Sequence, residues 1–106
     1  MALDKITEMQ NVSKAYWIAH VTVTDPDQYK HYAGDAPVAF KKYGAIFLAR
    51  GGAFEQVEGK GRPRNVVIEF PSLQAARDCY NSAEYQAARA KRVGAGEADI
   101  VIVEGV

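Results

Sequence analysis

Several features are scarce in this sequence of 106 residues, and each scarcity removes a class of protein. Cys79 is the single cysteine, so neither an internal disulfide nor a cysteine-based zinc site can form. The longest apolar run in the middle of the chain, residues 45–49, is far shorter than the ~18 residues that a membrane helix needs. With only two histidines, no clustered carboxylates and no cofactor fingerprint, the sequence predicts neither a metal site nor a cofactor.

Charge of one sign is also missing, because 13 basic residues balance 13 acidic residues and the formal net charge is +0. Nucleic-acid binding normally requires a basic face, so we expect no nucleic-acid partner. The single cysteine and the absence of an apolar signal-peptide core near the start favour the cytoplasm. Length and composition are typical of one globular domain, which we place at residues 14–106 after a polar arm at residues 1–13.

Apolar patterns and turn residues predict alternating strands and helices along the chain. Strands are expected at residues 15–23, 45–50, 65–70 and 98–104, with a short additional strand at 54–58. A helix is expected from Pro26 to Gly44, interrupted at Gly34 and Pro37, with Asp35 capping its second half. Two further helices should begin after Ser72 and Ser82. This order is the split βαβ pattern of an α+β, ferredoxin-like domain, with an antiparallel sheet and helices on one face.

The face of the sheet away from the helices is expected to be apolar. Side chains alternate between the two faces of a strand, which places Ile18 and Val67 on this open face beside His20. The second and last strands are apolar on both of their faces. A patch of that extent is seldom left exposed on a monomer, so we expect a homodimer that packs through this face.

Three short motifs are distinctive: LARGG at residues 48–52, EFPS at 69–72 and SAEY at 82–85. With the flanking segments, they make residues 14–105 resemble domain-of-unknown-function family 1330. The resemblance implies a dimeric α/β-barrel of ferredoxin-like protomers but no particular reaction. The wider superfamily includes cofactor-independent monooxygenases, lactone isomerases and haem-degrading proteins, with sites between sheet and helices. Cys79 departs from the family pattern, which often has an aromatic residue there; the change would alter a pocket or reflect repacking.

His20 and Glu69 are the candidate catalytic residues. The ferredoxin-like strand order is expected to place the first strand beside the third, running parallel, which brings the two side chains close together on the open face. A histidine beside a carboxylate can act as a general base in an oriented tautomer. The alternative is a structural pair, or a Glu69 held by an arginine across the dimer interface.

The candidate substrate-binding residues form separate groups. Arg50, Gly51 and Gly52 would hold a carboxylate or phosphate through the guanidinium and backbone N–H groups, or simply form a glycine-dependent turn. Arg92 lies on an inward helical face, where its charge needs Glu69 or a bound anion as a partner; Arg89 takes its place if the helix phase differs by one. The tyrosines at positions 80 and 85 are expected to form core or pocket wall.

The leading functional hypothesis is a homodimer that binds a small anionic molecule. A more specific form of this hypothesis is a cofactor-independent enzyme that acts on a small organic acid or carbonyl compound by acid/base chemistry. In this form Arg50 or Arg92 would hold the anionic group. The alternative is a non-catalytic dimerisation module, in which the arginines are structural and no ligand-sized cavity exists.

Overall fold

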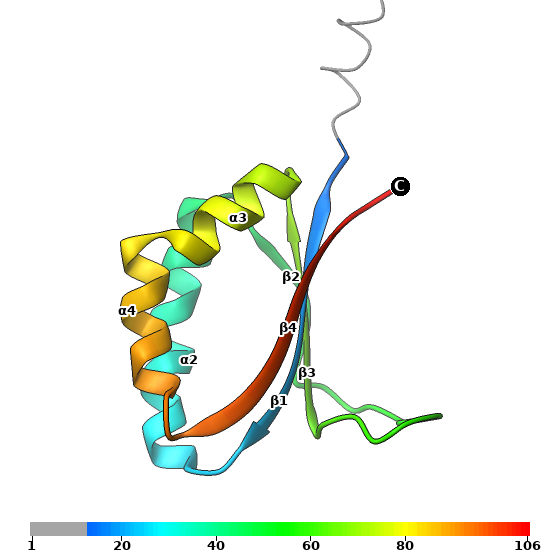
Figure 1. Cartoon of the computed structure of the whole chain (residues 1–106), viewed down its shortest axis with the longest axis vertical. Coiled ribbons are helices and arrows are strands. Elements are labelled where there is room, and N and C mark those ends of the chain that lie inside the picture. Colours follow the sequence, from blue (N-terminus) through cyan, green and yellow to red (C-terminus); the bar gives the residue numbers. More distant parts are fainter. Residues whose placement is uncertain (1–12) are drawn as a thin grey trace, which may run out of the picture.

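The computed structural model describes residues 13–106, which form a four-stranded sheet covered by helices on one side (Figure 1). The residues of the expected N-terminal arm from 1 to 12 lie outside the described part. All strand pairings are antiparallel, and the strand order is β2-β3-β1-β4. The elements in chain order are β1 (Ala15–Val23), α2 (Pro26–Lys42), β2 (Ile46–Arg50), β3 (Arg64–Phe70), α3 (Leu73–Asn81), α4 (Ala83–Arg92) and β4 (Gly96–Glu104). The ferredoxin-like α+β fold expected from the sequence is therefore confirmed.

The relative direction of β1 and β3 differs from the expectation. They are neighbours, as predicted, but they run antiparallel. The helix α2 returns the chain so that β2 runs in the same direction as β1, and the connection at residues 51–63 then reverses it into β3. This reversal changes which side chains of the two strands lie opposite each other.

Two local expectations were also wrong. Residues 54–58 form no strand, because the chain leaves the sheet after Gly51 and runs as an exposed loop with no strand to pair with. The helix α2 continues through Gly34 and Pro37. Proline normally disrupts a helix interior, but here the buried side chains on both sides of Pro37 anchor the helix to the core. Asp35 pairs with Lys91 of α4 and caps no second helix.

The core lies between the sheet and the helices, and aromatic rings dominate it. Trp17 is at its centre, with its ring centroid 4.9 Å from that of Tyr85 and 5.1 Å from that of Phe40. The predicted alternation holds on β1 and β3, whose inward residues are buried. These inward residues are Trp17, Ala19 and Val21 of β1, and Val66, Ile68 and Phe70 of β3.

The open face of the sheet is organised in rows that run across the strands. One row is apolar and joins Val67, Ile18 and Val101 on β3, β1 and β4. The next row lies nearer to the loop of residues 51–63; it is polar and joins Asn65, His20 and Asp99. Several large apolar side chains on this face are more than 45% exposed: Ile46, Leu48, Val101 and Val103. The open face thus combines an apolar centre with a polar end.

Candidate functional site

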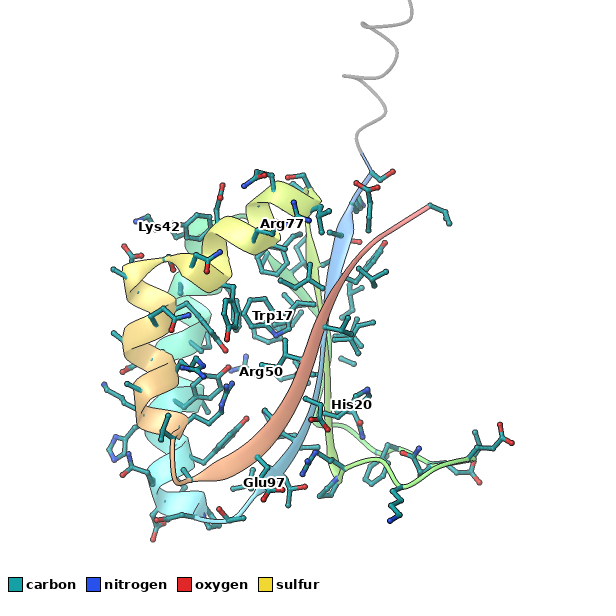
Figure 2. All side chains as sticks on the ribbon, viewed as in Figure 1. Trp17, His20, Lys42, Arg50, Arg77 and Glu97 are labelled. Atoms are coloured by element: carbon teal, nitrogen blue, oxygen red, sulfur yellow. The ribbon has the colours of Figure 1, made fainter. Side chains whose placement is uncertain are left out.

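A cavity of about 40 Å³ lies between the sheet and α2. Aromatic rings form much of its wall, from Trp17 on β1, Tyr29 and Tyr32 on α2, and Phe47 on β2. Figure 2 shows Trp17 and Arg50 between the two layers, whereas His20 lies on the opposite side of the sheet. We call this space the first cavity.

Three arginines from three different elements line the first cavity: Arg50, Arg64 and Arg92. Each guanidinium lies over an aromatic ring, at 4.3 Å from the Phe47 centroid, 5.7 Å from that of Tyr29 and 4.9 Å from that of Tyr32, respectively. Within residues 13–106, none of the three forms an ion pair with a carboxylate. Arg64 and Arg92 are half-buried, whereas Arg50 is exposed. Cation–π contacts compensate only part of the hydration that the two half-buried guanidiniums lose, so the cavity has an excess of positive charge.

Arg64 was not among the residues predicted from the sequence. Its Nε atom is buried and has no hydrogen-bond partner within the described residues. The signal was available in the alternation of β3, because residue 64 shares the inward face with Val66, Ile68 and Phe70. A charged residue at the start of an inward apolar series indicates a cavity-facing charge, as it does for Arg92 on α4.

The glycines after Arg50 have a structural explanation. Gly51 has a φ of +67°, and a Cβ at this position would lie 2.4 Å from Nη1 of Arg64. Its backbone N–H donates to the carbonyl of Asn65 at 2.8 Å, so this group is not free to bind an anion. Gly52 is exposed and does not line the first cavity. Of the predicted turn motif, Arg50 alone faces the cavity, and the ligand role of the glycine N–H groups is not supported at Gly51.

Tyr85 and Arg92 belong to a short chain of hydrogen bonds behind the first cavity. Nη1 of Arg92 donates to Oη of Tyr85 at 3.2 Å, and the hydroxyls of Tyr85 and Tyr32 are 2.9 Å apart. Burial raises the pKa of both phenols, so they remain protonated at neutral pH. If Tyr85 donates to Tyr32 while accepting from Arg92, the Tyr32 proton is left for a ligand, since Tyr32 lines the cavity.

The expected pair of His20 and Glu69 is wrong as a contact. In the antiparallel register His20 lies opposite Asn65, and Glu69 lies opposite Tyr16. Four residues along β1 separate these positions, which is about 13 Å. Glu69 instead lies 3.5 Å from Nζ of Lys14.

The alternative pairing of Glu69 with Arg92 is wrong as well. Glu69 lies on the open face of the sheet, whereas Arg92 extends from α4 towards the inward face. The sheet therefore separates the carboxylate from the guanidinium, and Arg92 has the two tyrosine rings as its neighbours instead.

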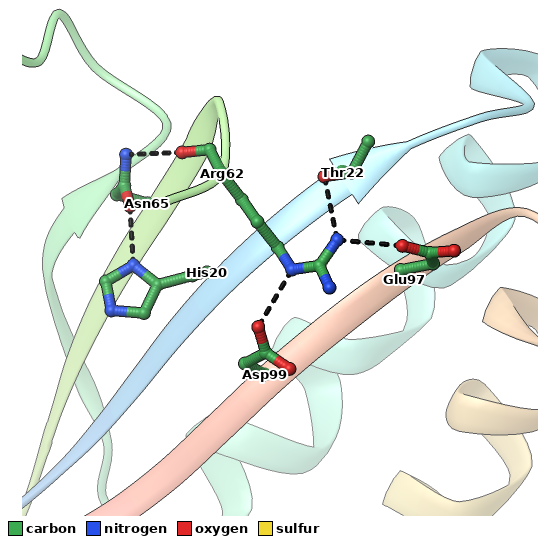
Figure 3. Close-up of polar contacts among 6 residues, drawn as sticks. All are labelled: His20, Thr22, Arg62, Asn65, Glu97 and Asp99. Atoms are coloured by element: carbon green, nitrogen blue, oxygen red, sulfur yellow. Dashed lines mark hydrogen bonds and ion pairs between the residues drawn. The ribbon is translucent and has the colours of Figure 1, made fainter. Parts of the chain in front are cut away.

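His20 belongs to a polar network at the loop end of the open face (Figure 3). Its Nδ1 is 2.6 Å from Oδ1 of Asn65, whose Nδ2 donates to the carbonyl of Arg62 at 3.3 Å. With Oδ1 of Asn65 as the acceptor, Nδ1 is the donating nitrogen, so in the neutral tautomer of this ring Nε2 is the acceptor. Arg62 also donates to Asp99 and Glu97 of β4, at 2.9 Å each, and thereby ties the end of the loop to the sheet.

A second cavity, of about 400 Å³, lies between β4 and the helices α3 and α4. Its wall includes Tyr80, Arg89 and Arg92, so both arginines considered in the sequence face the interior. Arg92 contributes to the walls of both cavities. The sequence analysis treated Arg89 and Arg92 as alternatives, but both side chains line the second cavity from the same side of α4.

Cys79 is fully buried and lines neither cavity. Burial raises the pKa of its thiol to about 12, so the thiol is neutral under ordinary conditions. The structure thus places Cys79 in the core packing and not in a pocket wall. Across residues 13–106, no cluster of three or more histidine, cysteine or acidic side chains is placed to bind a metal, and no helix has the length and apolar character needed to cross a membrane.

The fold and the two cavities define a ferredoxin-like α+β protein with arginine-rich spaces between sheet and helices. The chain belongs to the family described as Domain of unknown function (DUF1330), whose sequence profile matches residues 14–106. The resemblance inferred from the motifs is confirmed. A comparison with curated proteins finds no match.

Solved structures support the same fold. A protein of unknown function from Rhodopseudomonas palustris has a TM-score of 0.66 at 15% identity, covering 100% of this chain and 94% of its own. SnoaB, a cofactor-independent oxygenase from Streptomyces nogalater, has a TM-score of 0.65 at 8% identity, covering 90% and 95%. A dimeric protein of unknown function with a ferredoxin-like fold, from Bacteroides fragilis, has a TM-score of 0.59 at 13% identity, covering 87% and 96%. At these identities the likeness concerns the fold alone.

Proposed function

We propose that this protein is a homodimer that binds a small organic anion in the first cavity. The observation that carries the proposal is the set of three guanidiniums around an aromatic-walled space, none of them in an ion pair within the described residues. Arg64 and Arg92 are half-buried and Arg50 is exposed. Charges that are partly withdrawn from water are normally paired, so an anionic ligand is the natural partner of this cluster. Dimeric neighbours and the apolar row on the open face support the homodimer.

The size of the first cavity limits the ligand. A volume of about 40 Å³ holds roughly three water molecules at ~10–15 Å³ each on this measure. A carboxylate with a few further heavy atoms fits that space. The planar fork of an arginine suits a carboxylate, and the neutral Tyr32 hydroxyl suits a neighbouring carbonyl oxygen. We therefore take small oxo acids, with pyruvate as the probe, to represent the ligand class.

Replacing Arg64 with glutamine is expected to weaken pyruvate binding at least tenfold. A charge-assisted hydrogen bond contributes about 1.5–3 kcal/mol, which corresponds to roughly a tenfold to hundredfold change in affinity. Binding is measured from the fluorescence of Trp17, the single tryptophan, which lines the first cavity. Arg77→Gln is the matched control, because Arg77 is exposed on α3 and lines neither cavity. Equal affinity in wild type and Arg64→Gln would refute the proposed site.

Acid/base catalysis on the open face is the second candidate function. The first cavity has no carboxylate or imidazole among its lining residues, so a general base would have to lie elsewhere. His20 has an acceptor nitrogen. In a dimer packed through the open face, the His20 side chain would face the space between the subunits. This candidate keeps His20 and Glu69 as separate groups on one surface.

The exchange of the pyruvate methyl protons in D₂O tests this candidate. Nε2 of His20 would take a proton from the carbon next to the carbonyl and return a deuteron. We expect exchange above the buffer rate with the wild type, and the buffer rate with the double variant His20→Gln/Glu69→Gln, as followed by ¹H NMR. Exchange that is equally fast in the double variant would exclude both groups.

The competing hypothesis of a dimerisation module is disfavoured by the two cavities, which such a module does not need.

A further inference from the structure

The second cavity has its own unexplained charge. Nε of Arg89 is buried and has no hydrogen-bond partner within residues 13–106. Neither Arg89 nor Arg92 forms an ion pair within this part of the chain. Leaving a buried donor of a charged group unsatisfied costs more than leaving a neutral one unsatisfied. Arg89 is half-buried on α4 beside the fully buried Ala88, so its charged group is partly withdrawn from water without a carboxylate to offset it.

The rest of the wall has the opposite character. Ala98, Ile100 and Ile102 form an apolar strip along the inward face of β4, and the ring of Tyr80 faces it from α3. No acidic residue lines the second cavity. The cavity thus has a cationic end at α4 and an apolar side along β4. Its volume of about 400 Å³ lies in the range of ~300–1,000 Å³ typical of small-molecule sites.

We propose that the second cavity is a separate binding site for a carboxylic acid with a short apolar tail. The carboxylate lies against the guanidiniums of Arg89 and Arg92, and the tail lies along Ile100 and Ile102. A free inorganic anion would satisfy the arginines but leave the apolar strip in contact with water, so an amphipathic acid is the better occupant. This site does not depend on the occupant proposed for the first cavity; the two share only Arg92.

Methyl NMR of isoleucine-labelled protein tests the proposal with hexanoate as the probe. Within residues 13–106 the isoleucines report on three places at once: residues 100 and 102 in the second cavity, residue 68 in the first, and residues 18 and 46 on the open face. We expect saturable shifts at Ile100 and Ile102. Arg89→Gln should weaken this binding at least tenfold, whereas the matched control Arg77→Gln should leave it unchanged. Shifts at other isoleucines only, or an affinity within twofold in Arg89→Gln, would overturn the proposal.

A neutral ligand provides a test that needs no variant to fold. Hexanamide has the same length as hexanoate but lacks the charge, so it should bind the wild-type protein at least tenfold more weakly. Equal binding of the two would show that the arginines do not select the ligand, and would refute the proposal. Arg64→Gln separates the two sites: it should lose pyruvate and retain hexanoate. If pyruvate fails to bind while hexanoate shifts Ile100 and Ile102, the proposed function of the first cavity fails and the second site stands.

Discussion

Replacing Trp17 with alanine is expected to lower the free energy of unfolding by about 3–5 kcal/mol, the usual cost of removing a large buried aromatic ring. Trp17 is 1% exposed, and its indole packs against rings from α2, α3, α4 and β3. Small domains have a free energy of unfolding of only about 5–15 kcal/mol, so the variant should lose a large part of its stability. Urea unfolding followed by far-UV circular dichroism measures the change, since the variant has no tryptophan to report by fluorescence.

Two further variants make this result interpretable. Trp17→Phe keeps an aromatic ring in the same place and should cost clearly less than the alanine. Val38→Ala removes apolar atoms from a side chain that is 69% exposed on α2, and should change the stability by less than about 0.5 kcal/mol. All variants are compared at one protomer concentration, because the stability of a dimer depends on it. A loss below about 1 kcal/mol in Trp17→Ala would contradict the central place assigned to this ring.

Elements with strong local signals were predictable from the sequence. The strand of residues 15–23 was predicted with its observed bounds, because aromatic and β-branched residues fill it and Asp25-Pro26 follow as a helix start. Ser72 and Ser82 were recognised as helix caps, and each accepts a hydrogen bond from the backbone N–H three residues later. In these places short-range chemistry and the final fold agree.

Errors arose where distant contacts outweigh local preference. Pro37 favours a break, but the buried face of α2 packs on the core along its whole length and keeps the helix continuous. Residues 54–58 include Phe54 and Val57, residue types common in strands, yet a strand needs a neighbour, and the loop leaves the sheet. Neither outcome is visible in the affected segment alone.

The candidate site shows the same division. Face assignments by alternation were correct for Trp17 and Ile68, and the same rule identifies Arg64 when it is applied to every charged residue. The predicted contact between His20 and Glu69 was wrong because it depended on the relative direction of β1 and β3. The alternation of side chains along a strand gives no information about that direction. An error in direction shifts the partner by several residues while leaving every residue on its correct face.

The alternation of side chains along each strand therefore gives the two faces of the sheet different chemistry. On the inward side, Arg50, Arg64 and the helical Arg92 line the first cavity, each over an aromatic ring. On the open face, the apolar row at the centre is flanked by the hydrogen-bonded group of His20 and Asn65. Ligand binding and dimerisation can thus be altered by separate substitutions, because no residue of the apolar row lines either cavity.

Replacing Val101 with aspartate is expected to convert the proposed dimer to a monomer. Val101 is 54% exposed on β4 and stands beside Ile18 in the apolar row of the open face. In a two-fold dimer the substitution places an unpaired carboxylate from each subunit in the apolar interface, where desolvation opposes association. A penalty of about 3 kcal/mol raises the dissociation constant at least hundredfold. Analytical ultracentrifugation over a range of micromolar concentrations measures this change directly.

Val38→Asp is the matched control, since it adds the same charge at a similarly exposed valine on the helical side of the molecule. It should leave the dissociation constant unchanged, and pyruvate and hexanoate should bind the Val101→Asp monomer as they bind the wild type, because neither cavity includes residue 101. If Val101→Asp associates as tightly as the wild type, the subunits meet through some other surface. If the wild-type protein is itself a monomer at these concentrations, the open face is not a self-association surface, and the acid/base role proposed for His20 between two subunits fails with it.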